Sequence, residues 1–185
     1  MKRVVPHASV AIVVAALCAG VGRAQGQMPV GLKAAVVNAK PVRSCESLAT
    51  VALPATTIES AALDASNPNI CRVVAIATHP PASDKVRIWI AIPVVGWNGQ
   101  FMGIGGGGFH GGSATAVNPP VASGFAAGST DTGHAGGSAA FALDTAGKLD
   151  WQAIRNFAHV GIHEMTVTGK ALTTALYGVA PKYSY

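Results

Sequence analysis

The sequence predicts an α/β fold with an antiparallel hairpin at the edge of its sheet and one long crossover helix. Three observations support this prediction. Two apolar strands flank a turn that contains prolines, a run of glycines follows a third short strand, and a long amphipathic segment separates a fourth strand from a last one. This order is the opening half of an α/β sheet, so we expect the fold to be cut in the middle and the chain to be truncated.

The first 24 residues have the pattern of a signal peptide. Lys2 and Arg3 precede an apolar stretch over residues 10–21, and the small-residue pattern Gly22-Arg23-Ala24 follows. The apolar run is too short to span a membrane comfortably. We therefore expect cleavage after Ala24, a secreted or periplasmic mature chain, and no stable membrane association.

The signal peptide holds most of the positive charge. The whole sequence has a net charge of +5, and removal of Lys2, Arg3 and Arg23 leaves ten basic against eight acidic residues, a net charge of +2. No basic stripe remains that would favour a nucleic-acid partner. We divide the mature chain into a flexible leader over residues 25–44, which is small, polar and unpatterned, and one folded domain over residues 45–185.

Two cysteines, Cys45 and Cys71, remain after export. An even pair in an oxidising compartment favours a disulfide over a metal site. The alternative is two buried thiols. The third cysteine, Cys18, lies in the signal peptide, where Leu17 occupies a position at which a lipoprotein signal needs a small residue.

The first half of the domain predicts a hairpin. Residues 45–65 are Ala-rich and weakly helical, with an interruption at Pro54. A clear strand covers residues 71–78, and the prolines of the turn over residues 79–84 end its ladder pairing. The next strand, residues 85–92, alternates apolar positions with mixed ones, which indicates one buried face.

The second half predicts two further strands and the helix. Residues 101–104 form a short strand before the glycine run, and residues 121–129 form a nearly continuous apolar strand before a polar turn. Asp150 is a suitable N-cap for a helix over residues 151–177. Gly178 and Pro181 end this helix, and residues 182–185 begin another strand.

The glycine run over residues 105–108 is the first candidate site. Its backbone turns freely and no Cβ atoms shield its amide groups, so these amides can approach a ligand closely. In acyl transfer, amides of the loop after the third strand stabilise the oxygen that becomes negative in the tetrahedral intermediate. We therefore predict that the amides of Gly107 and Gly108 belong to an oxyanion hole. The alternative is a tight turn that only packs a strand against its neighbour.

Nucleotide-binding interpretations of the same glycines fit less well. Gly103, Gly105 and Gly108 match Gly-x-Gly-x-x-Gly, but that fingerprint needs a helix that opens at the third glycine. The Asn-Pro-Pro sequence at residues 118–120 lies in the following loop, where no such helix is expected. A phosphate-binding loop also fails, because neither Gly-Lys-Ser nor Gly-Lys-Thr follows.

His159 and His163 are four residues apart on the predicted helix, which is a spacing that metal ligands use. The helical zinc-protease motif needs Glu directly after its first His, and Val160 occupies that position, while Glu164 follows the second His. We therefore expect a polar helix face and no metal site.

Asp131 and His134 lie in the polar turn after the fourth strand. They resemble members of a catalytic pair and are candidates for lining the site, although a polar turn that closes a strand is the simpler interpretation. No Gly-x-Ser-x-Gly nucleophile elbow occurs in the sequence. The sequence therefore gives no candidate for a serine nucleophile.

Six segments of the chain form a pattern when taken in order. They are Cys71-Arg72-Val73, Trp97 to Phe101, the glycine run with Phe109, Ser129 to His134, His163 to Val167, and Tyr183-Ser184-Tyr185. Together they resemble the amino-terminal portion of secreted tannase and feruloyl esterase family hydrolases, and the resemblance covers essentially the whole mature chain from Cys45 onward. Two positions depart from the family pattern, Gln100 where a basic residue is usual and Gly106 where Asn is common.

This resemblance implies the amino-terminal half of an α/β-hydrolase sheet. It also implies an enzyme, a serine esterase that cleaves small esters of aromatic acids such as ferulate or gallate by a Ser-His-Asp acyl-enzyme mechanism. In the family pattern the nucleophilic Ser, the Asp and the His all lie beyond Tyr185, so we expect this chain alone to be inactive. Calcium is associated with the lid of family members, and no ligands for it carry over to this chain, for which we expect no cofactor. The alternative is a non-catalytic exported binding or scaffold module.

Overall fold

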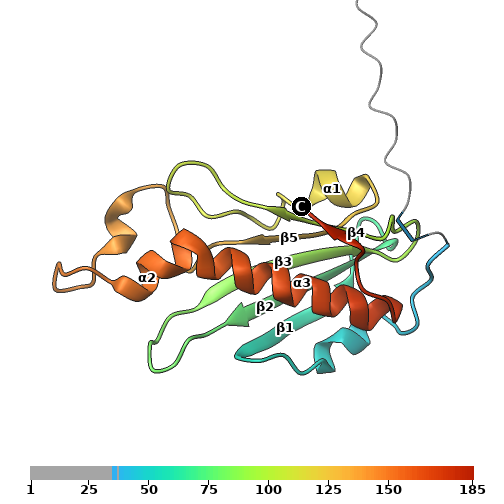
Figure 1. The fold of residues 1–185 in the computed structure, drawn as a ribbon, viewed down its shortest axis with the longest axis horizontal. Helices are drawn as coiled ribbons and strands as arrows, with labels where there is room; N and C mark the ends of the chain where they lie inside the picture. Colours follow the sequence, from blue (N-terminus) through green and yellow to red (C-terminus); the bar gives the residue numbers. More distant parts are fainter. Residues whose placement is uncertain (1–34, 37) are drawn as a thin grey trace, which may run out of the picture. The chain divides into compact units, whose positions relative to one another are not determined.

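The structure is a computed structural model that describes residues 35–36 and 38–185 (Figure 1). The predicted signal peptide, residues 1–24, and the first part of the predicted leader lie outside the described residues. The domain is built on one six-stranded sheet with the order β1-β2-β3-β5-β4-β6. Figure 1 shows α2 and α3 lying along one face of this sheet.

Within residues 35–36 and 38–185, the structure has six strands and three α-helices. The strands are β1 (Thr56–Leu63), β2 (Ile70–Ala77), β3 (Val86–Pro93), β4 (Gln100–Ile104), β5 (Ala126–Thr130) and β6 (Tyr183–Ser184). The α-helices are α1 (Asn118–Ala122), α2 (Trp151–Arg155) and α3 (Gly161–Tyr177). Two short 3₁₀ helices, η1 (Glu46–Thr50) and η2 (Ala139–Ala142), and a π-helical segment, η3 (Asn156–Val160), complete the list.

The antiparallel pairing of the predicted hairpin is confirmed, whereas its position at the edge of the sheet is wrong, because β1 lies outside β2. β2 pairs with β3 along its whole length, with Val74 opposite Trp89 and Ala77 opposite Val86. β1 pairs with the outer side of β2 and extends the antiparallel part of the sheet by one strand. The prediction of a weakly helical stretch over residues 45–65 is therefore wrong beyond η1. The strand forms there because β2 offers it an unpaired edge, and this tertiary pairing outweighs the weak helix preference of its alanines.

The other strands form the parallel part of the sheet. β5 pairs antiparallel with β3, and β4 runs parallel to both β5 and β6. The strand that we predicted over residues 121–129 begins only at Ala126. The preceding residues form α1, in which Pro119 lies in the first turn, and Gly124 then turns the chain at a φ of 84°.

The predicted long helix is present over residues 151–177 with one irregularity. Asp150 caps it, because its side chain accepts a 2.9 Å hydrogen bond from the Ala153 amide. Gly178 ends it in the left-handed conformation, with a φ of 69°. Between α2 and α3 the chain widens into the π-helical segment η3, which begins at the buried residue Asn156. Such segments interrupt the regular helical hydrogen bonding and often mark functional sites.

Apolar side chains cover both faces of the sheet. Successive residues of a strand point to opposite faces, so Ile90 and Ala91 of β3 belong to different layers. The larger layer contacts α3 through Met165, Leu172 and Leu176. The smaller layer packs against α1 through Val117, Val121 and Ala127.

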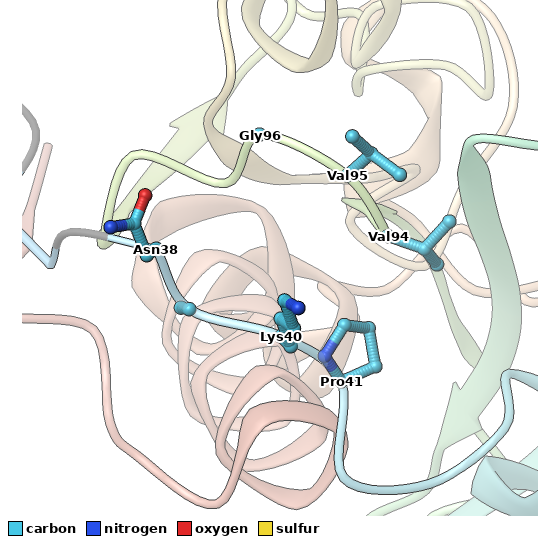
Figure 2. A pocket seen from close by; sticks show the side chains of 7 residues that line it. Asn38, Lys40, Pro41, Val94, Val95 and Gly96 are labelled. Carbon is cyan, nitrogen blue, oxygen red and sulfur yellow. The ribbon is translucent and has the colours of Figure 1, made fainter.

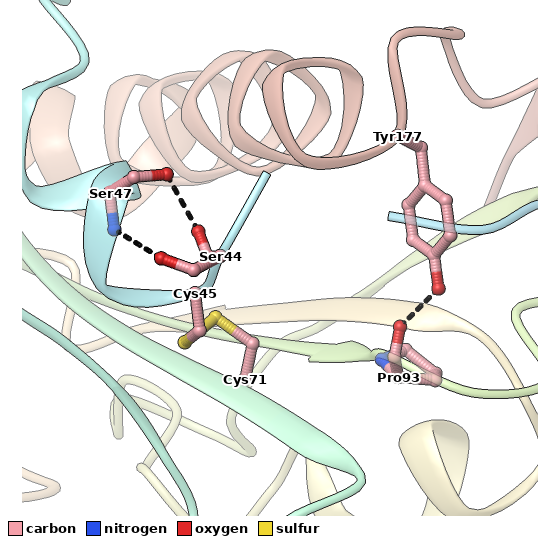
Figure 3. The surroundings of a disulfide bond; sticks show 6 residues. All are labelled: Ser44, Cys45, Ser47, Cys71, Pro93 and Tyr177. Carbon is pink, nitrogen blue, oxygen red and sulfur yellow. Dashed lines mark hydrogen bonds between the residues drawn. A yellow bond between two sulfur atoms is a disulfide. The ribbon is translucent and has the colours of Figure 1, made fainter. Parts of the chain in front are cut away.

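The predicted disulfide is confirmed between Cys45, just before η1, and Cys71 of β2 (Figure 3). Both cysteines are buried in the larger apolar layer. In the same region Tyr177, at the end of α3, donates a hydrogen bond from its hydroxyl group to the Pro93 carbonyl at the end of β3. Burial raises the pKa of Tyr177 to about 12, so this hydroxyl stays protonated and available as a donor.

Candidate functional site

The candidate site lies where β4 and β5 end. The segment over residues 105–112, which we name the glycine loop, follows β4, and the polar turn that begins at Asp131 follows β5. Because β4 and β5 are parallel, their carboxyl ends lie at the same edge of the sheet. This is the edge at which α/β folds bind ligands.

Three glycines of the glycine loop allow close backbone packing. A Cβ atom at Gly106 would lie 2.2 Å from the Gly111 carbonyl oxygen, and one at Gly111 would lie 2.2 Å from the Asp131 carbonyl oxygen. A Cβ atom at Gly112 would lie 2.0 Å from the Ser129 hydroxyl oxygen. Real Cβ atoms do not approach other atoms so closely, so the loop folds back against β5 only because these positions lack side chains.

Gly107 and Gly108 differ from these packed glycines. A Cβ atom at either position would meet no atom within 4 Å, and both residues are exposed. Gly108 has a φ of 61°, which places it in the left-handed region. Among the described residues, neither amide donates a hydrogen bond to another backbone group, whereas the Gly107 carbonyl accepts a 3.1 Å bond from the His110 amide. The two amides predicted for the oxyanion hole are therefore free to bind a ligand, although their role stays a prediction.

Ser129 anchors both ends of the glycine loop. Its buried hydroxyl group donates a 2.9 Å hydrogen bond to the Ile104 carbonyl, at the start of the loop. The same oxygen accepts a 3.2 Å bond from the Ser113 amide, at the end of the loop, and the Gly112 amide donates a 2.6 Å bond to the Thr130 carbonyl. The sequence gives no signal for this function of Ser129, because it depends on residues 16 and 25 positions away.

His134 contacts the middle of the glycine loop. Its Nε2 atom lies 2.7 Å from the Phe109 carbonyl oxygen, which can only accept, so Nε2 donates this bond. The imidazole stacks on the ring of Phe141, with centroids 4.1 Å apart, and meets Phe157 edge-on at 5.5 Å. The aromatic contacts fix the orientation of the ring that holds the loop.

The carboxylate of Asp131 binds backbone amides. Its Oδ1 atom accepts hydrogen bonds from the amide of Arg87 at 2.9 Å and from that of Gly133 at 2.7 Å. Burial raises the pKa of Asp131, an effect that these two hydrogen bonds oppose but do not cancel. The Asp131 carboxylate thus closes the polar turn through Gly133 and joins this turn to β3 through Arg87.

Asp131 and His134 line the same hollow. This hollow has a volume of about 460 Å³, and its other walls include Trp89, His110 and the last two residues of the glycine loop. The structure thus brings together the glycine loop, Asp131 and His134, which the sequence predicted separately. Their catalytic or binding roles stay predictions.

A larger hollow, of about 790 Å³, lies away from this site (Figure 2). It is lined by residues 38–41 and by Val94, Val95 and Gly96, which follow β3. Because β3 is antiparallel to β5, these residues lie at the edge of the sheet opposite the glycine loop. None of the predicted site residues lines it.

His159 and His163 do not form a cluster with other ligands. Both are exposed on the outer side of the helix, whereas Glu164 is half-buried and its Oε1 atom lies 4.0 Å from Nε2 of His79. Across residues 35–36 and 38–185, no group of three or more His, Cys, Asp or Glu side chains is placed to hold a metal ion. In the same part of the chain, no helix combines the length and the apolar character that a membrane crossing requires.

Comparison with known proteins supports the resemblance found in the sequence. Residues 71–185 match the family model described as tannase and feruloyl esterase. A probable feruloyl esterase from Arthroderma benhamiae is 35% identical over 130 residues, which cover 65% of this chain and 24% of that protein. An uncharacterised esterase from Xanthomonas campestris is 32% identical over 170 residues, which cover 82% of this chain and 28% of that protein. The chain therefore spans about a quarter of the length of these curated relatives.

Solved structures show the same fold. Feruloyl esterase B from Aspergillus oryzae superposes with a TM-score of 0.60 at 24% identity, over 76% of this chain and 30% of that one. The tannin acyl hydrolase from Aspergillus niger gives a TM-score of 0.59 at 26% identity, over 76% of this chain and 31% of that one. The predicted fold class is confirmed by these neighbours together with the mixed six-stranded sheet.

Proposed function

The chain belongs to the tannase and feruloyl esterase family, and on this premise we propose that it supplies the oxyanion-binding loop of a secreted esterase that cleaves esters of aromatic acids. The observation that supports the proposal is the state of Gly107 and Gly108. Both are exposed at the carboxyl edge of the parallel strands, and neither amide donates to another backbone group of the described chain. An oxyanion hole needs two such donors where a carbonyl oxygen becomes negative.

The proposed reaction has two steps. A serine oxygen attacks the ester carbonyl carbon while a histidine takes the serine proton, and the carbonyl oxygen becomes an oxyanion that accepts hydrogen bonds from Gly107 and Gly108. The bond to the alcohol then breaks, the histidine protonates the departing alcohol, and an acyl-enzyme remains. Water repeats the sequence on the acyl-enzyme, with the serine as leaving group, and releases the aromatic acid.

We assign none of the three triad roles to residues of this chain. The sequence has no nucleophile elbow. The Asp131 carboxylate is occupied by two backbone amides, and Nε2 of His134 donates to a carbonyl group. A histidine that acts as general base must instead present an unprotonated nitrogen to the serine.

Export of the protein is supported by two observations. The first 24 residues have the composition of a signal peptide. The buried disulfide between Cys45 and Cys71 is of a kind that persists in oxidising compartments. Secretion or transfer to the periplasm is therefore part of the proposal.

Calcium, which the resemblance associates with the lid of family members, finds no ligand set in the described part of the chain. Calcium needs six to eight oxygen ligands, several of them carboxylates. No suitable group of acidic side chains occurs in residues 35–36 and 38–185. We therefore derive no step of the reaction from a metal ion.

The proposal is tested by comparing two proteins, residues 25–185 alone and the product of the complete reading frame that contains this sequence. We expect the complete product to hydrolyse methyl ferulate or methyl gallate with saturation kinetics, and residues 25–185 to hydrolyse neither ester faster than buffer. A saturable rate from residues 25–185 would contradict our placement of the nucleophile. An inactive, folded complete product would contradict the esterase function and favour a non-catalytic module.

A matched pair of variants tests the oxyanion donors in the complete product. Gly107→Pro removes the amide hydrogen and should lower kcat by about 10²- to 10³-fold. Gly107→Ala keeps the amide hydrogen, and its added Cβ atom meets nothing within 4 Å. The alanine variant should therefore retain most of the activity. Equal losses in both variants would show that the amide of Gly107 is not the donor.

A further inference from the structure

We propose that His134 is a positioning residue, which holds the Phe109 carbonyl group and thereby orients the Gly107 and Gly108 amides toward the substrate. The inference rests on the proposed function, because it assigns a role in the same oxyanion-binding loop. In this role His134 contacts the loop and does not contact the substrate.

The glycine loop has fixed ends, and Gly107 and Gly108 in its middle are exposed. Ser129 and Thr130 bind the ends, through Ile104, Gly112 and Ser113. Between them, the backbone makes a turn that is closed by the 3.1 Å bond from the His110 amide to the Gly107 carbonyl, and the ring of Phe109 packs against those of Phe141 and Phe157. Glycines without side-chain contacts have more backbone freedom than any other residue, so such a turn does not hold one orientation by itself.

His134 supplies a fixed point for this turn from another part of the chain. Phe109 directly follows Gly108, and its carbonyl oxygen lies 2.7 Å from Nε2 of His134. The Phe109 carbonyl shares its peptide plane with the His110 amide, and that amide donates to the Gly107 carbonyl, which shares a plane with the Gly108 amide. A hydrogen bond from His134 therefore fixes a peptide plane that is bonded to the one holding the Gly108 amide. Because errors of about 1 Å in the position of a catalytic group reduce rates about 100-fold, a fixed plane at this point matters for the reaction.

The imidazole is itself held by three contacts. It stacks on Phe141 of η2 with an interplanar angle of 20°, and it meets Phe157 of the π-helical segment at 70°. Its Nδ1 atom lies 3.2 Å from the Thr132 hydroxyl oxygen. Through these contacts of the His134 ring, the loop is connected to η2 and to the π-helical segment.

The hydrogen-bond pattern separates positioning from proton transfer. Nε2 carries a proton both in the neutral Nε2–H tautomer and in the imidazolium form, so either form can donate to the Phe109 carbonyl. A donor of the same reach should therefore replace the histidine. An apolar ring of similar shape should keep the stacking and lose the bond.

Two substitutions of His134 separate the hydrogen bond from the stacking. His134→Gln keeps a donor near the position of Nε2, and His134→Phe keeps an aromatic ring on Phe141 without a donor. His163→Phe, on the exposed side of α3, is the matched control for the introduction of phenylalanine. Each variant is first checked for an unchanged Tm and an unchanged spectrum away from the loop.

The first measurement uses the 185-residue chain and needs no activity. Backbone ¹⁵N order parameters of Gly107 and Gly108 should be near 0.8 in the original chain, fall below about 0.6 in His134→Phe, and recover in His134→Gln. The ¹⁵N shifts of the His134 ring should show a protonated Nε2 atom. Unchanged order parameters in a folded His134→Phe variant, or an unprotonated Nε2 atom, would overturn the proposal. If His134→Phe does not fold, the ring shifts and the His134→Gln order parameters still decide it.

The second measurement uses the complete reading-frame product with methyl ferulate. His134→Phe should lower kcat by about 100-fold with KM nearly unchanged, and His134→Gln should restore most of kcat with the original pH profile. Loss of activity in both variants together with an altered pH profile would show that His134 transfers protons, and would overturn the positioning role. If the original product has no esterase activity, the proposed function fails, while the order parameters still decide whether His134 holds the loop.

Discussion

The side-chain amide of Asn156 donates a 2.7 Å hydrogen bond to Oδ2 of Asp84, and it thereby joins two residues that are 72 positions apart. Asn156 is the first residue of the π-helical segment and is buried, whereas Asp84 lies in the turn before β3. The same carboxylate accepts the His79 amide at 3.1 Å and contacts Nδ1 of His79 at 2.6 Å. This polar cluster fixes the turn of the β2–β3 hairpin against the helix that supports the candidate site.

Asp84 should make the stability of the protein depend on pH. Burial alone would raise the pKa of Asp84, but hydrogen bonds from His79 and Asn156 outweigh burial and lower it below its ordinary value of 3.8. A carboxyl group with a lowered pKa stabilises the folded state above pH 3.8, and this contribution is lost as the pH falls through the folded pKa. Asp84→Asn should therefore lower the free energy of unfolding at pH 7 by roughly 1 kcal/mol, with a smaller difference at pH 2–3.

Urea denaturation of both proteins between pH 2 and pH 7 measures this difference. Glu46→Gln is a suitable control, because Glu46 is exposed in η1 and takes no part in the cluster. A destabilisation by Asp84→Asn that is independent of pH would show that the charge of Asp84 is not what stabilises the turn.

Asp131 should show the opposite dependence on pH. Its pKa is raised by burial, so its ionisation costs stability as the pH rises through the folded pKa. Asp131→Asn keeps an oxygen acceptor for the Arg87 and Gly133 amides, and its stability relative to the original protein should improve between pH 3 and pH 7. Asp131→Ala leaves both amides without their acceptor and should destabilise the protein by about 1–3 kcal/mol. Thermal unfolding of the original protein and of both variants across this pH range measures these differences. If Asp131→Asn and Asp131→Ala lost the same stability at every pH, the side-chain oxygen would not be the acceptor that stabilises the turn.

Gly169 of α3 should not tolerate a side chain. A Cβ atom at this position would lie 2.3 Å from the ring of Phe101 and 3.0 Å from Ile90. Although alanine favours the helix by about 1 kcal/mol over glycine, the overpacked contact should cost more, and we expect a net loss of about 1–2 kcal/mol for Gly169→Ala. Lys170→Ala, at the exposed neighbouring position, should change the stability by less than about 0.5 kcal/mol. Chemical denaturation measures both, and a stabilised Gly169→Ala variant would mean that α3 and β4 are further apart than described.

The disulfide should contribute substantially to stability. It joins residues separated by 26 positions, and closure of such a loop stabilises the folded state by roughly 3 kcal/mol in the chain-entropy model. The Cys45→Ala/Cys71→Ala double variant should therefore lose a similar amount in urea denaturation under non-reducing conditions. Addition of a reductant should destabilise the original protein and leave the double variant unchanged. A reductant effect of equal size on both proteins would point to a cause other than this bond.

Much of the fold could be predicted because its signals are local. The alternating apolar residues before Pro93 predicted β3, and the N-cap at Asp150 and the left-handed Gly178 marked both ends of the long helix. These signals depend only on residues two to four positions apart. The strand β1 escaped prediction because its stability comes from pairing with β2, and not from a pattern within residues 56–63.

For the candidate site, the sequence by itself determined the chemistry that is available, namely a glycine run after a strand and a polar turn with Asp131 and His134. Only the tertiary structure decided how these parts act together. It placed the Ser129 hydroxyl group against both ends of the glycine loop and the Nε2 atom of His134 against the Phe109 carbonyl. Such contacts join residues 16 to 25 positions apart through the pairing of two parallel strands, so no pattern of neighbouring residues encodes them.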